Sequence, residues 1–372
     1  MRATRWSIAE LVSPELHELE SVASPARGAE LIAKLDANES PISFDSEAVA
    51  DLGHALSAVS LNRYGDNRSG TLRKMLAAAH GVAPDQLSIA NGSNEIIRLL
   101  ATVFGRPRRG RARPRVLYPS PTFFGYRAAA LLARAEVVEV PLREDMSLDV
   151  AATSAALAAT RPNLAFFCRP NNPTGTLWPR EALEELSARH ADTLIVVDEV
   201  YAAYAGSTLL DLLPRLPNLM ILRSISKIGG AGLRVGYAIA HPEVISKLEL
   251  IRPPFAVSAL NEAAAVWLLT RGADKVAASI AAVIEERRRM LAELAEMPEI
   301  STFPSHANYF LFRYGRPGDR RATALWQRLL QRGIVTSSFD RPGPLAGCVR
   351  VTIGTRREND LFLDTLRAVK EP

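Results

Sequence analysis

Residues 224–234 read Ser-Ile-Ser-Lys-Ile-Gly-Gly-Ala-Gly-Leu-Arg, and the interpretation of the whole chain starts from this stretch. An apolar run at 219–222 precedes it and another at 235–240 follows it, and both patterns predict buried β-strands. Lys227 is therefore expected in a glycine-rich connection between two strands. A lysine held in this way can form a Schiff base with an aldehyde, although a lone loop lysine is usually just a solvated charge.

The residues around Lys227 indicate that such an aldehyde would carry a phosphate. Ser224 and Ser226 offer hydroxyl groups and Arg234 offers a guanidinium, and all of these bind phosphate well. The glycines allow the backbone to approach a ligand closely. These features favour pyridoxal 5′-phosphate (PLP) as the cofactor.

Other motifs with a similar spacing do not fit the sequence. Ser224 and Lys227 have the Ser-x-x-Lys spacing of a penicillin-binding nucleophile, but the chain lacks the Ser-Asp-Asn and Lys-Thr-Gly partners, which excludes a serine hydrolase of this type. The glycines form neither the dinucleotide-binding pattern nor a Walker A motif.

Composition describes an ordinary globular protein. The 372 residues are enough for two domains, with 48% hydrophobic and 23% charged residues. The net charge of +5 includes one dense basic run at 106–115, which lacks interleaved aromatics and is expected to be a solvated loop, not a nucleic-acid site. Two cysteines and six scattered histidines predict neither a disulfide framework nor a metal site.

The expected location is the cytoplasm. The first residues are rich in glutamate and contain no apolar leader segment, and no apolar run is long enough to cross a bilayer. We therefore expect no membrane partner.

Strand and helix patterns alternate from about residue 35 to 245, which predicts an α/β fold. We expect a three-layer, mostly parallel sheet with helices on both faces. The expected division is an N-terminal arm (1–30), a large cofactor-binding domain (31–245) and a smaller α+β C-terminal domain (246–372). Ligands of such sheets bind outside the carboxyl ends of the strands.

Several candidate residues follow the predicted strands. Ser93 and Asn94 begin a helix whose free N–H groups can bind an anion, although an ordinary capping box has the same pattern. Phe123 can stack on a flat ring or simply cap the core. Asn172 can donate to a ring oxygen, although Asn-Pro turns are common.

Asp198 ends the apolar run 194–197 and is more informative. Burying a carboxylate is costly unless a cation accompanies it. A protonated pyridine nitrogen would be such a cation and would keep the ring an electron sink. Tyr201, three residues further on, can reach the phenolic oxygen of the ring.

Three further residues have two interpretations each. Asn38 is either a substrate contact or turn chemistry. Tyr64 either offers its phenol to a phosphate or is a surface tyrosine. Arg350 lies between apolar residues in a predicted strand, and its guanidinium needs a carboxylate from within the chain or from an amino-acid substrate.

Together these motifs resemble the fold-type I PLP-dependent aminotransferases. The resemblance rests on Asn-Pro-Thr-Gly at 172–175, Asp198 with Tyr201, Ser-x-Ser-Lys with Arg234, and Cys-Val-Arg-Val-Thr-Ile-Gly at 348–354. Within that superfamily the chain is similar to the histidinol-phosphate aminotransferase branch. The segments that support this are residues 34–41, 62–64, 92–97, 170–175 and 252–255.

The resemblance implies roles around the cofactor. Lys227 would form the Schiff base and move a proton between substrate Cα and cofactor C4′, and Asp198 would pair with the pyridinium nitrogen. Tyr201 and Asn172 would bind the ring oxygen, with Phe123 stacked on the ring. The residues implied to hold the cofactor phosphate are Ser93, Asn94, Ser224, Ser226 and Arg234.

The resemblance also implies substrate contacts and an assembly. Arg350 would bind the α-carboxylate of glutamate, and Asn38 would contact the substrate. A homodimer is expected, in which Tyr64 reaches the phosphate of the neighbouring subunit.

The chain departs from this branch where the substrate phosphate would bind. The family usually has an Arg or Lys where this chain has Thr336 and Ser337, and a Pro-Tyr in an N-terminal arm that here has no tyrosine. Losing a charge-assisted phosphate contact costs about 1.5–3 kcal/mol. Arg332 or Arg341 could replace the missing cation from nearby.

The leading prediction is therefore an aminotransferase for histidinol phosphate and 2-oxoglutarate. One alternative is a related aminotransferase for another, aromatic or secondary-pathway amino acid. Another is a PLP decarboxylase of the threonine-phosphate type. A PLP-sensing regulator would need a DNA-binding domain, for which the expected arm is too short.

Overall fold

The computed structural model describes residues 11–19, 31–316, 318, 320–339 and 342–368. Most of the expected N-terminal arm lies outside these ranges. Its described part contains one 3-10 helix, η2 (Pro14–Glu18).

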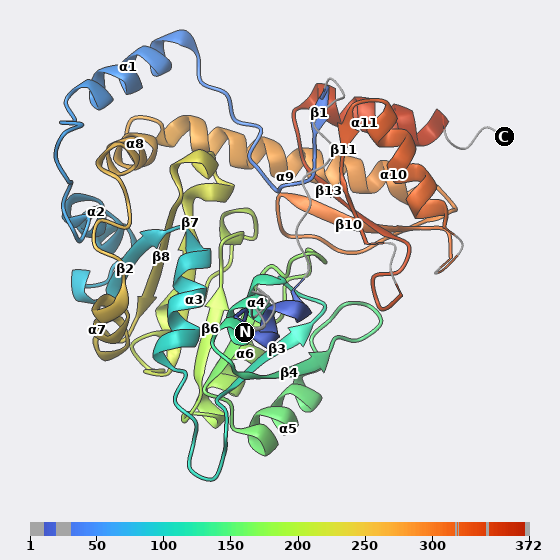
Figure 1. Ribbon diagram of the computed structural model, residues 1–372. Helices are drawn as coiled ribbons and strands as arrows, with labels where there is room; N and C mark the ends of the chain where they lie inside the picture. The colour runs from blue at the N-terminus through green and yellow to red at the C-terminus, as the bar shows by residue number, and fades with distance from the viewer. Residues whose placement is uncertain (1–10, 20–30, 317, 319, 340–341, 369–372) are drawn as a thin grey trace, which may run out of the picture.

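A seven-stranded sheet with the order β2-β8-β7-β6-β5-β3-β4 forms the centre of the molecule (Figure 1). Strands β4, β3, β5, β6 and β7 are parallel, and β8 is antiparallel to both of its neighbours. The expected mostly parallel sheet is confirmed. The strands are β2 (Leu87–Asn91), β3 (Arg115–Ser120), β4 (Glu136–Pro141), β5 (Leu164–Cys168), β6 (Leu194–Asp198), β7 (Leu219–Ser224) and β8 (Val235–Ala240).

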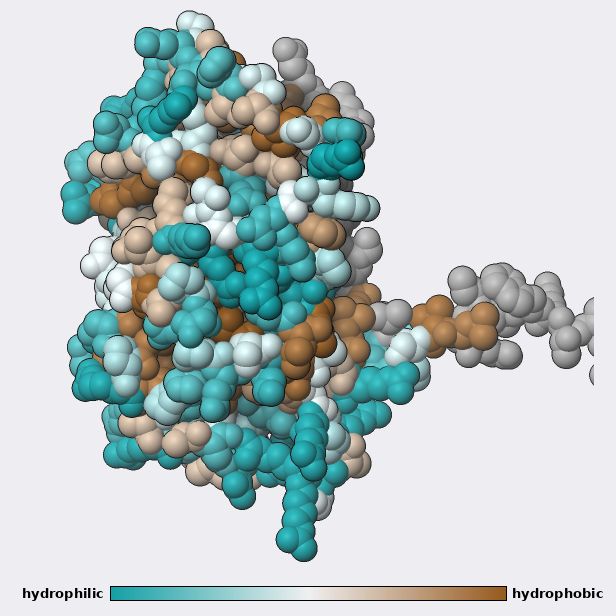
Figure 2. All heavy atoms as spheres, turned by 90° about the vertical axis from the view of Figure 1, so that its left-hand side faces the viewer, coloured by the Kyte–Doolittle hydropathy of each residue, from teal (hydrophilic) through white to brown (hydrophobic). Residues whose placement is uncertain are grey.

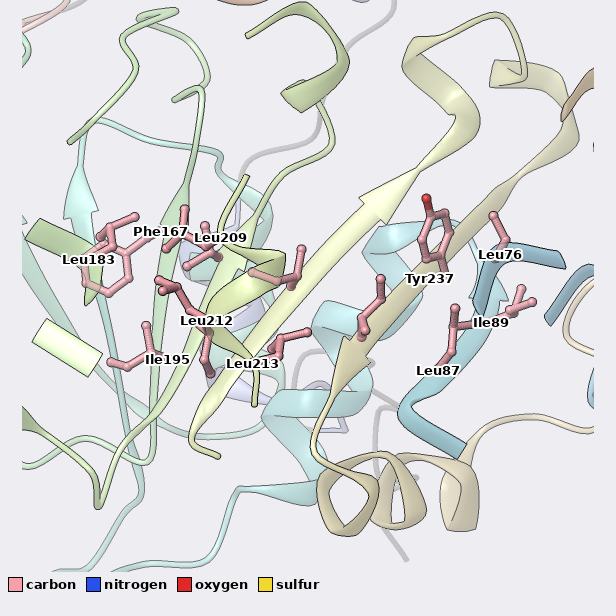
Figure 3. Close-up of a cluster of buried hydrophobic side chains, with 14 of the residues drawn as sticks. Leu76, Leu87, Ile89, Phe167, Leu183, Ile195, Leu209, Leu212, Leu213 and Tyr237 are labelled. Atoms are coloured by element: carbon pink, nitrogen blue, oxygen red, sulfur yellow. The ribbon is translucent and has the colours of Figure 1, made fainter. Parts of the chain in front are cut away.

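Alternate side chains of the strands enter two hydrophobic clusters on opposite faces of the sheet. Phe167 and Ile195 belong to one cluster, shown in Figure 3, whereas Phe166 and Val196 belong to the other. Both faces are therefore buried, which is why these strands are continuously apolar.

Helices cover each face and complete three layers. Those that contribute buried residues to the Phe167 cluster are α2 (Gly70–His80), α5 (Val150–Thr160), α6 (Arg180–Arg189), α8 (Ala259–Leu269) and the first turn of α9 (Ala273–Ala295), and the partly buried side of α1 (Ser46–Ser57) packs against it. Those in the Phe166 cluster are α3 (Ser93–Val103), α4 (Gly125–Leu132) and α7 (Pro242–Ile251).

A second sheet with the order β12-β13-β10-β9 lies in the C-terminal part and is antiparallel throughout. Its strands are β9 (Ile300–Thr302), β10 (Tyr309–Tyr314), β12 (Ser337–Ser338) and β13 (Cys348–Thr352). Helices α9 (Ala273–Ala295), α10 (Arg321–Gln331) and α11 (Arg356–Ala368) pack with it around a third apolar cluster. This is the expected α+β arrangement.

The packing refines the expected division of the chain. β1 (Ala33–Lys34) pairs in parallel with β11 (Ile334–Val335), so the segment after the arm lies beside the C-terminal strands (Figure 1). α7 and α8 pack on the large sheet instead. Helix α9 joins the two parts, because Val276 lies in the first cluster and Met290 in the third. The boundaries at 31 and 245 remain predictions.

Within the described ranges, no helix combines the length and the apolar character needed to cross a membrane.

Candidate active site

A cavity of about 230 Å³ lies where β5, β6 and β7 end. Of the residues to which the resemblance assigns a contact with the cofactor or the substrate, all except Tyr64 line it. Arg234 reaches the same edge because β8 is antiparallel to β7 and begins where β7 ends. The cavity also contains four residues that sequence reasoning did not single out, namely Ala37, Phe124, Cys168 and Val200.

Lys227 is held in place by both its backbone and its side chain. It ends the 3-10 helix η6 (Ile225–Lys227), whose cap is the Ser224 hydroxyl, which accepts from the Ser226 N–H at 3.0 Å and donates to the Val235 carbonyl at 3.0 Å. The Tyr204 hydroxyl donates to the Lys227 carbonyl at 2.6 Å, and Nζ donates to the Ala37 carbonyl at 3.1 Å.

The environment of Lys227 makes its amine a usable nucleophile. Burial, followed by the positive charge of Arg350, lowers the pKa of Lys227 to about 8. An appreciable fraction of the amine is therefore neutral near neutral pH, and the neutral form is the one that attacks an aldehyde.

Asp198 is buried, and each of its carboxylate oxygens accepts one hydrogen bond. The Tyr126 hydroxyl donates to Oδ2 at 2.8 Å, and the Val200 N–H donates to Oδ1 at 3.3 Å. Burial raises the pKa of Asp198 to about 6, although both donors act in the opposite direction. No cationic side chain among the described residues forms an ion pair with it.

An anion-binding cradle lies at the start of α3. Gly92, at φ +84°, precedes the helix and supplies no side-chain cap, so the first N–H groups remain available. A Cβ atom at Gly236 would approach the Ser93 nitrogen to 2.1 Å, and one at Gly92 would approach Arg234 Nη2 to 2.5 Å. Glycine at both positions therefore lets the helix end and the guanidinium share one small space.

Tyr201 and Asn172 line another part of the cavity. The Tyr201 hydroxyl accepts from Asn38 Nδ2 at 2.9 Å, which leaves its own proton to donate. Burial raises the pKa of Tyr201, so it stays a neutral phenol. Asn172 Oδ1 accepts from Arg350 Nη1 at 2.7 Å.

Arg350 has neutral partners instead of an acid. Nη2 donates to the Ser337 hydroxyl at 3.0 Å and to the Asp36 carbonyl, and Nε is buried without a hydrogen-bond partner. In the described part of the chain no carboxylate pairs with this guanidinium. One interpretation of Arg350 was a carboxylate partner from within the chain, and the described residues contain no such partner. The other interpretation is a carboxylate of the substrate.

These groups together fit PLP. An aldehyde can react with the Lys227 amine, a pyridinium can neutralise the buried Asp198, and a phosphate can fill the cradle of helix N–H groups, Ser226 and Arg234. The donor set thus matches these three functional groups of the cofactor.

A family model described as aminotransferase class I and II matches residues 32–366. The chain belongs to the class I and II aminotransferases. The family predicted from the sequence motifs is confirmed.

Curated relatives of this aminotransferase share most of its length. Histidinol-phosphate aminotransferase 1 from Burkholderia mallei is 38% identical over 336 residues, covering 90% of this chain and 91% of the relative. Histidinol-phosphate aminotransferase from Chromobacterium violaceum is 36% identical over 367 residues, covering 98% and 99%.

Solved structures of the same fold include several enzymes. A putative histidinol-phosphate aminotransferase from Erwinia carotovora atroseptica has a TM-score of 0.81 at 26% identity, covering 91% of this chain and 96% of that one. The enzyme from Sinorhizobium meliloti in complex with pyridoxal-5′-phosphate has a TM-score of 0.83 at 24% identity, covering 96% and 98%, and shows a shared fold. So does L-threonine-O-3-phosphate decarboxylase from Porphyromonas gingivalis (0.76, 24%, covering 92% and 100%).

Two expected phosphate contacts of the aminotransferase lie away from the cavity. Tyr64 is 82% exposed and stacks on Phe255, with ring centroids 4.5 Å apart. Arg332 is exposed at the end of α10 and does not line the cavity. Arg341, the other expected substitute cation, lies outside the described residues.

The departures at 336 and 337 lie close to Arg350. The Ser337 hydroxyl accepts from Arg350 and donates to the Asp36 carbonyl at 3.0 Å. The Thr336 hydroxyl is buried without a hydrogen-bond partner. Neither residue supplies the positive charge that the family pattern has there.

Sequence reasoning missed Tyr126, which supports Asp198 from behind. One signal could have located it. Tyr126 follows Phe123 by three residues, so an aromatic residue close in sequence to a candidate cofactor contact was the available signal.

Proposed function

We propose that this aminotransferase transfers the amino group of histidinol phosphate to 2-oxoglutarate, giving imidazole acetol phosphate and glutamate in histidine biosynthesis. The observation that carries the proposal is the set of curated relatives with that activity in their names, at 33 to 38% identity over at least 90% of this chain.

PLP is the cofactor. When bound, it supplies an electron sink for the bond that breaks at the substrate Cα. The protein contributes attachment, orientation and proton transfer.

Lys227 takes up and returns the proton at the substrate Cα. Its lowered pKa of about 8 suits a group that must both accept and donate a proton near neutral pH. The Tyr204 and Ala37 contacts hold its backbone and its amine on the cavity side.

The other roles follow from charge and donor type. Asp198 holds the ring nitrogen in its protonated form, and Tyr201 and Asn172 orient the ring through its oxygen. Phe123 lies at the cavity wall with its ring edge-on to Tyr126, 5.5 Å away, where it can stack on the cofactor. Ser93, Asn94, Ser226 and Arg234 hold the phosphate, and Ser224 shapes the turn that carries Lys227.

Arg350 binds the anionic group of both substrates in turn. Among the described residues that line the cavity, the cations are Lys227, Arg234 and Arg350. The first two serve the cofactor, so Arg350 remains for the glutamate carboxylate in one half-reaction and the histidinol phosphate group in the other. Its unpartnered Nε and the Ser337 hydroxyl add donors to this subsite.

A second candidate substrate follows from the departures. Thr336 and Ser337 leave the subsite with one fewer positive charge than the family pattern, which favours an amino acid without a phosphate, such as an aromatic one. The reaction type is the same, so only the substrate distinguishes the two candidates. A decarboxylase of the threonine-phosphate type would also need a phosphate-binding cation and gains nothing from these residues.

The expected cytoplasmic location remains a prediction.

The assembly that we propose is a homodimer. Figure 2 views the side that carries α1, α2 and α7 and shows hydrophobic residues between hydrophilic ones. The loop with Tyr64 lies against residues 252–255, because Asn67 accepts hydrogen bonds from Arg252 and Phe255. Exposed apolar residues of these segments, suited to an interface, are Leu61, Tyr64, Leu250, Ile251, Phe255 and Leu260.

The test is a half-reaction followed by the absorbance of the bound cofactor. Histidinol phosphate should convert the cofactor from its aldehyde-derived form to its amine form, and an aromatic amino acid should do so far more slowly. Conversion by glutamate but not by histidinol phosphate would favour the second candidate. Lys227→Ala is the negative control, and transamination in that variant would refute the assignment of Lys227.

A further inference from the structure

Tyr126 is a buried titratable residue for which the mechanism above has no role. It lies in the first turn of α4, has no solvent exposure, and donates its hydroxyl to Asp198 Oδ2 at 2.8 Å. Tyr126 does not line the cavity, and its hydrogen bond to Asp198 links it directly to the charged group that does.

Aromatic neighbours fix the Tyr126 ring. It stacks on Phe166 with ring centroids 4.8 Å apart and planes 5° apart. The ring of Phe123 meets it edge-on at 5.5 Å, and Tyr118 lies 6.3 Å away. A ring held in this way keeps its hydroxyl at one position, so the contact with Asp198 needs no further ordering.

The contact opposes the effect of burial on Asp198. Burial favours the neutral acid, whereas a hydrogen bond donated to the carboxylate favours the ion. The pKa of Tyr126 is well above its ordinary value because of burial and the neighbouring Asp198 charge, so the phenol stays a donor. Removing its hydroxyl should therefore raise the pKa of Asp198 above about 6, so that more of the carboxyl group is protonated near neutral pH.

Other groups around Asp198 also act on its charge. Lys227 favours the carboxylate through its charge, Glu199 opposes it, and the Val200 N–H donates to the other oxygen. The remaining titratable groups that face Asp198 are neutral near pH 7 because burial raises their pKa, namely Cys168, Tyr201 and Tyr309.

We propose that Tyr126 is a positioning residue for transamination, whose hydroxyl keeps Asp198 ionised and oriented toward the ring nitrogen of the cofactor. The inference rests on the proposed PLP-dependent function. It goes beyond that function in assigning the support of the electron sink to a residue outside the cavity.

The experiment compares Tyr126→Phe with Tyr118→Phe as a matched control. Tyr118 also donates to a carboxylate, Glu139 Oε1 at 3.0 Å, and its ring neighbours Tyr126, but its hydroxyl does not bond to Asp198. PLP is titrated into each apoprotein across a range of pH, and binding is followed by fluorescence quenching. The acid limb of the pH–rate profile is measured on the loaded enzymes.

Tyr126→Phe should bind PLP about tenfold more weakly near neutral pH, the loss expected for a hydrogen bond to a charged group. The loss should shrink at alkaline pH, where Asp198 ionises without help, and the acid limb should move to higher pH. Tyr118→Phe should match the wild type. Equal losses at every pH, or no difference between the two variants, would overturn the inference.

A double variant separates electrostatics from packing. In an Asp198→Asn background, Tyr126→Phe should cause no further loss of PLP affinity, because the charge it supports is gone. If Tyr126→Phe alone fails to fold, refolding of the double variant supports the inference and continued misfolding overturns it. A wild-type protein that does not bind PLP would instead refute the proposed function, and the inference with it.

Discussion

At the scale of single residues, the Lys227 amine sets a pH dependence for cofactor capture. Its pKa of about 8 predicts that the rate at which apoprotein binds PLP rises with pH and levels off above about 8. The positive charge of Arg350 contributes to the lowering, so Arg350→Gln should shift this rise to higher pH. Stopped-flow absorbance measures both curves. An unshifted curve in the variant would show that Arg350 does not act on the amine.

The buried Asp198 carboxylate lowers the stability of the apoprotein, although the cofactor needs it. The pKa of Asp198 is raised from 3.8 to about 6 in the folded apoprotein, so the folded state holds the proton more tightly than the unfolded chain does. The stability of the apoprotein should therefore decrease as pH rises from about 4 to about 6, and the loss persists above that range.

Asp198→Asn should remove this loss. The variant apoprotein should melt at a higher temperature than the wild type near pH 8 and show little difference near pH 4. The same variant should use PLP poorly, because it cannot pair with the ring nitrogen as an anion. Calorimetry of both apoproteins at the two pH values provides the measurement, and an equal melting temperature at pH 8 would contradict the argument.

At the scale of elements, the contact between β8 and the start of α3 forms the phosphate cradle. Gly236→Ala should push the two apart, because the added Cβ would lie 2.1 Å from the Ser93 nitrogen. We expect PLP affinity to fall at least about tenfold, as the loss of one charge-assisted phosphate contact predicts.

Gly53→Ala is the matched control for this substitution. Gly53 lies in α1, where an added Cβ would meet no atom within 4 Å. That variant should bind PLP like the wild type and gain slightly in stability, since alanine favours helix over glycine. Equal PLP affinity in the two variants would show that the cradle tolerates the shift.

The elements also show what the sequence could predict. Strands β5 to β8 were predictable because each contains a continuous apolar run, and the polar residues that follow the runs of β5, β6 and β7 identified the edge with the cavity. The β1–β11 pairing was not, because two-residue strands have no periodicity and their partners lie far apart in the chain. The Tyr126–Asp198 contact was missed for a related reason, since only folding brings α4 over β6.

At the scale of the whole molecule, the proposed dimer makes Tyr64 testable by mixing variants. Tyr64→Ala and Lys227→Ala should each be nearly inactive alone. If Tyr64 serves the neighbouring subunit, a hybrid dimer contains one site with both residues intact. Random exchange of subunits should then restore about a quarter of wild-type activity.

Activity after unfolding and joint refolding of the two variants is the measurement. Mixing the two variants without exchange is the control. If activity does not return although subunit exchange has been verified, Tyr64 acts at the active site of its own chain and not at that of its neighbour.

The hydrogen bonds of residues 35–38 also determine when the cavity is completed during synthesis on the ribosome. Leu35 bonds to Val335, Asp36 accepts from Arg350, and the Ala37 carbonyl accepts from Lys227. Residues that lie far apart in the sequence therefore complete the cavity together. On the ribosome they are made at different times, because synthesis proceeds at about 5–20 residues per second. A nascent chain has finished the large sheet well before Arg350 emerges. Arg350 therefore completes the substrate side of the cavity only after all the residues proposed to hold the cofactor have been synthesised.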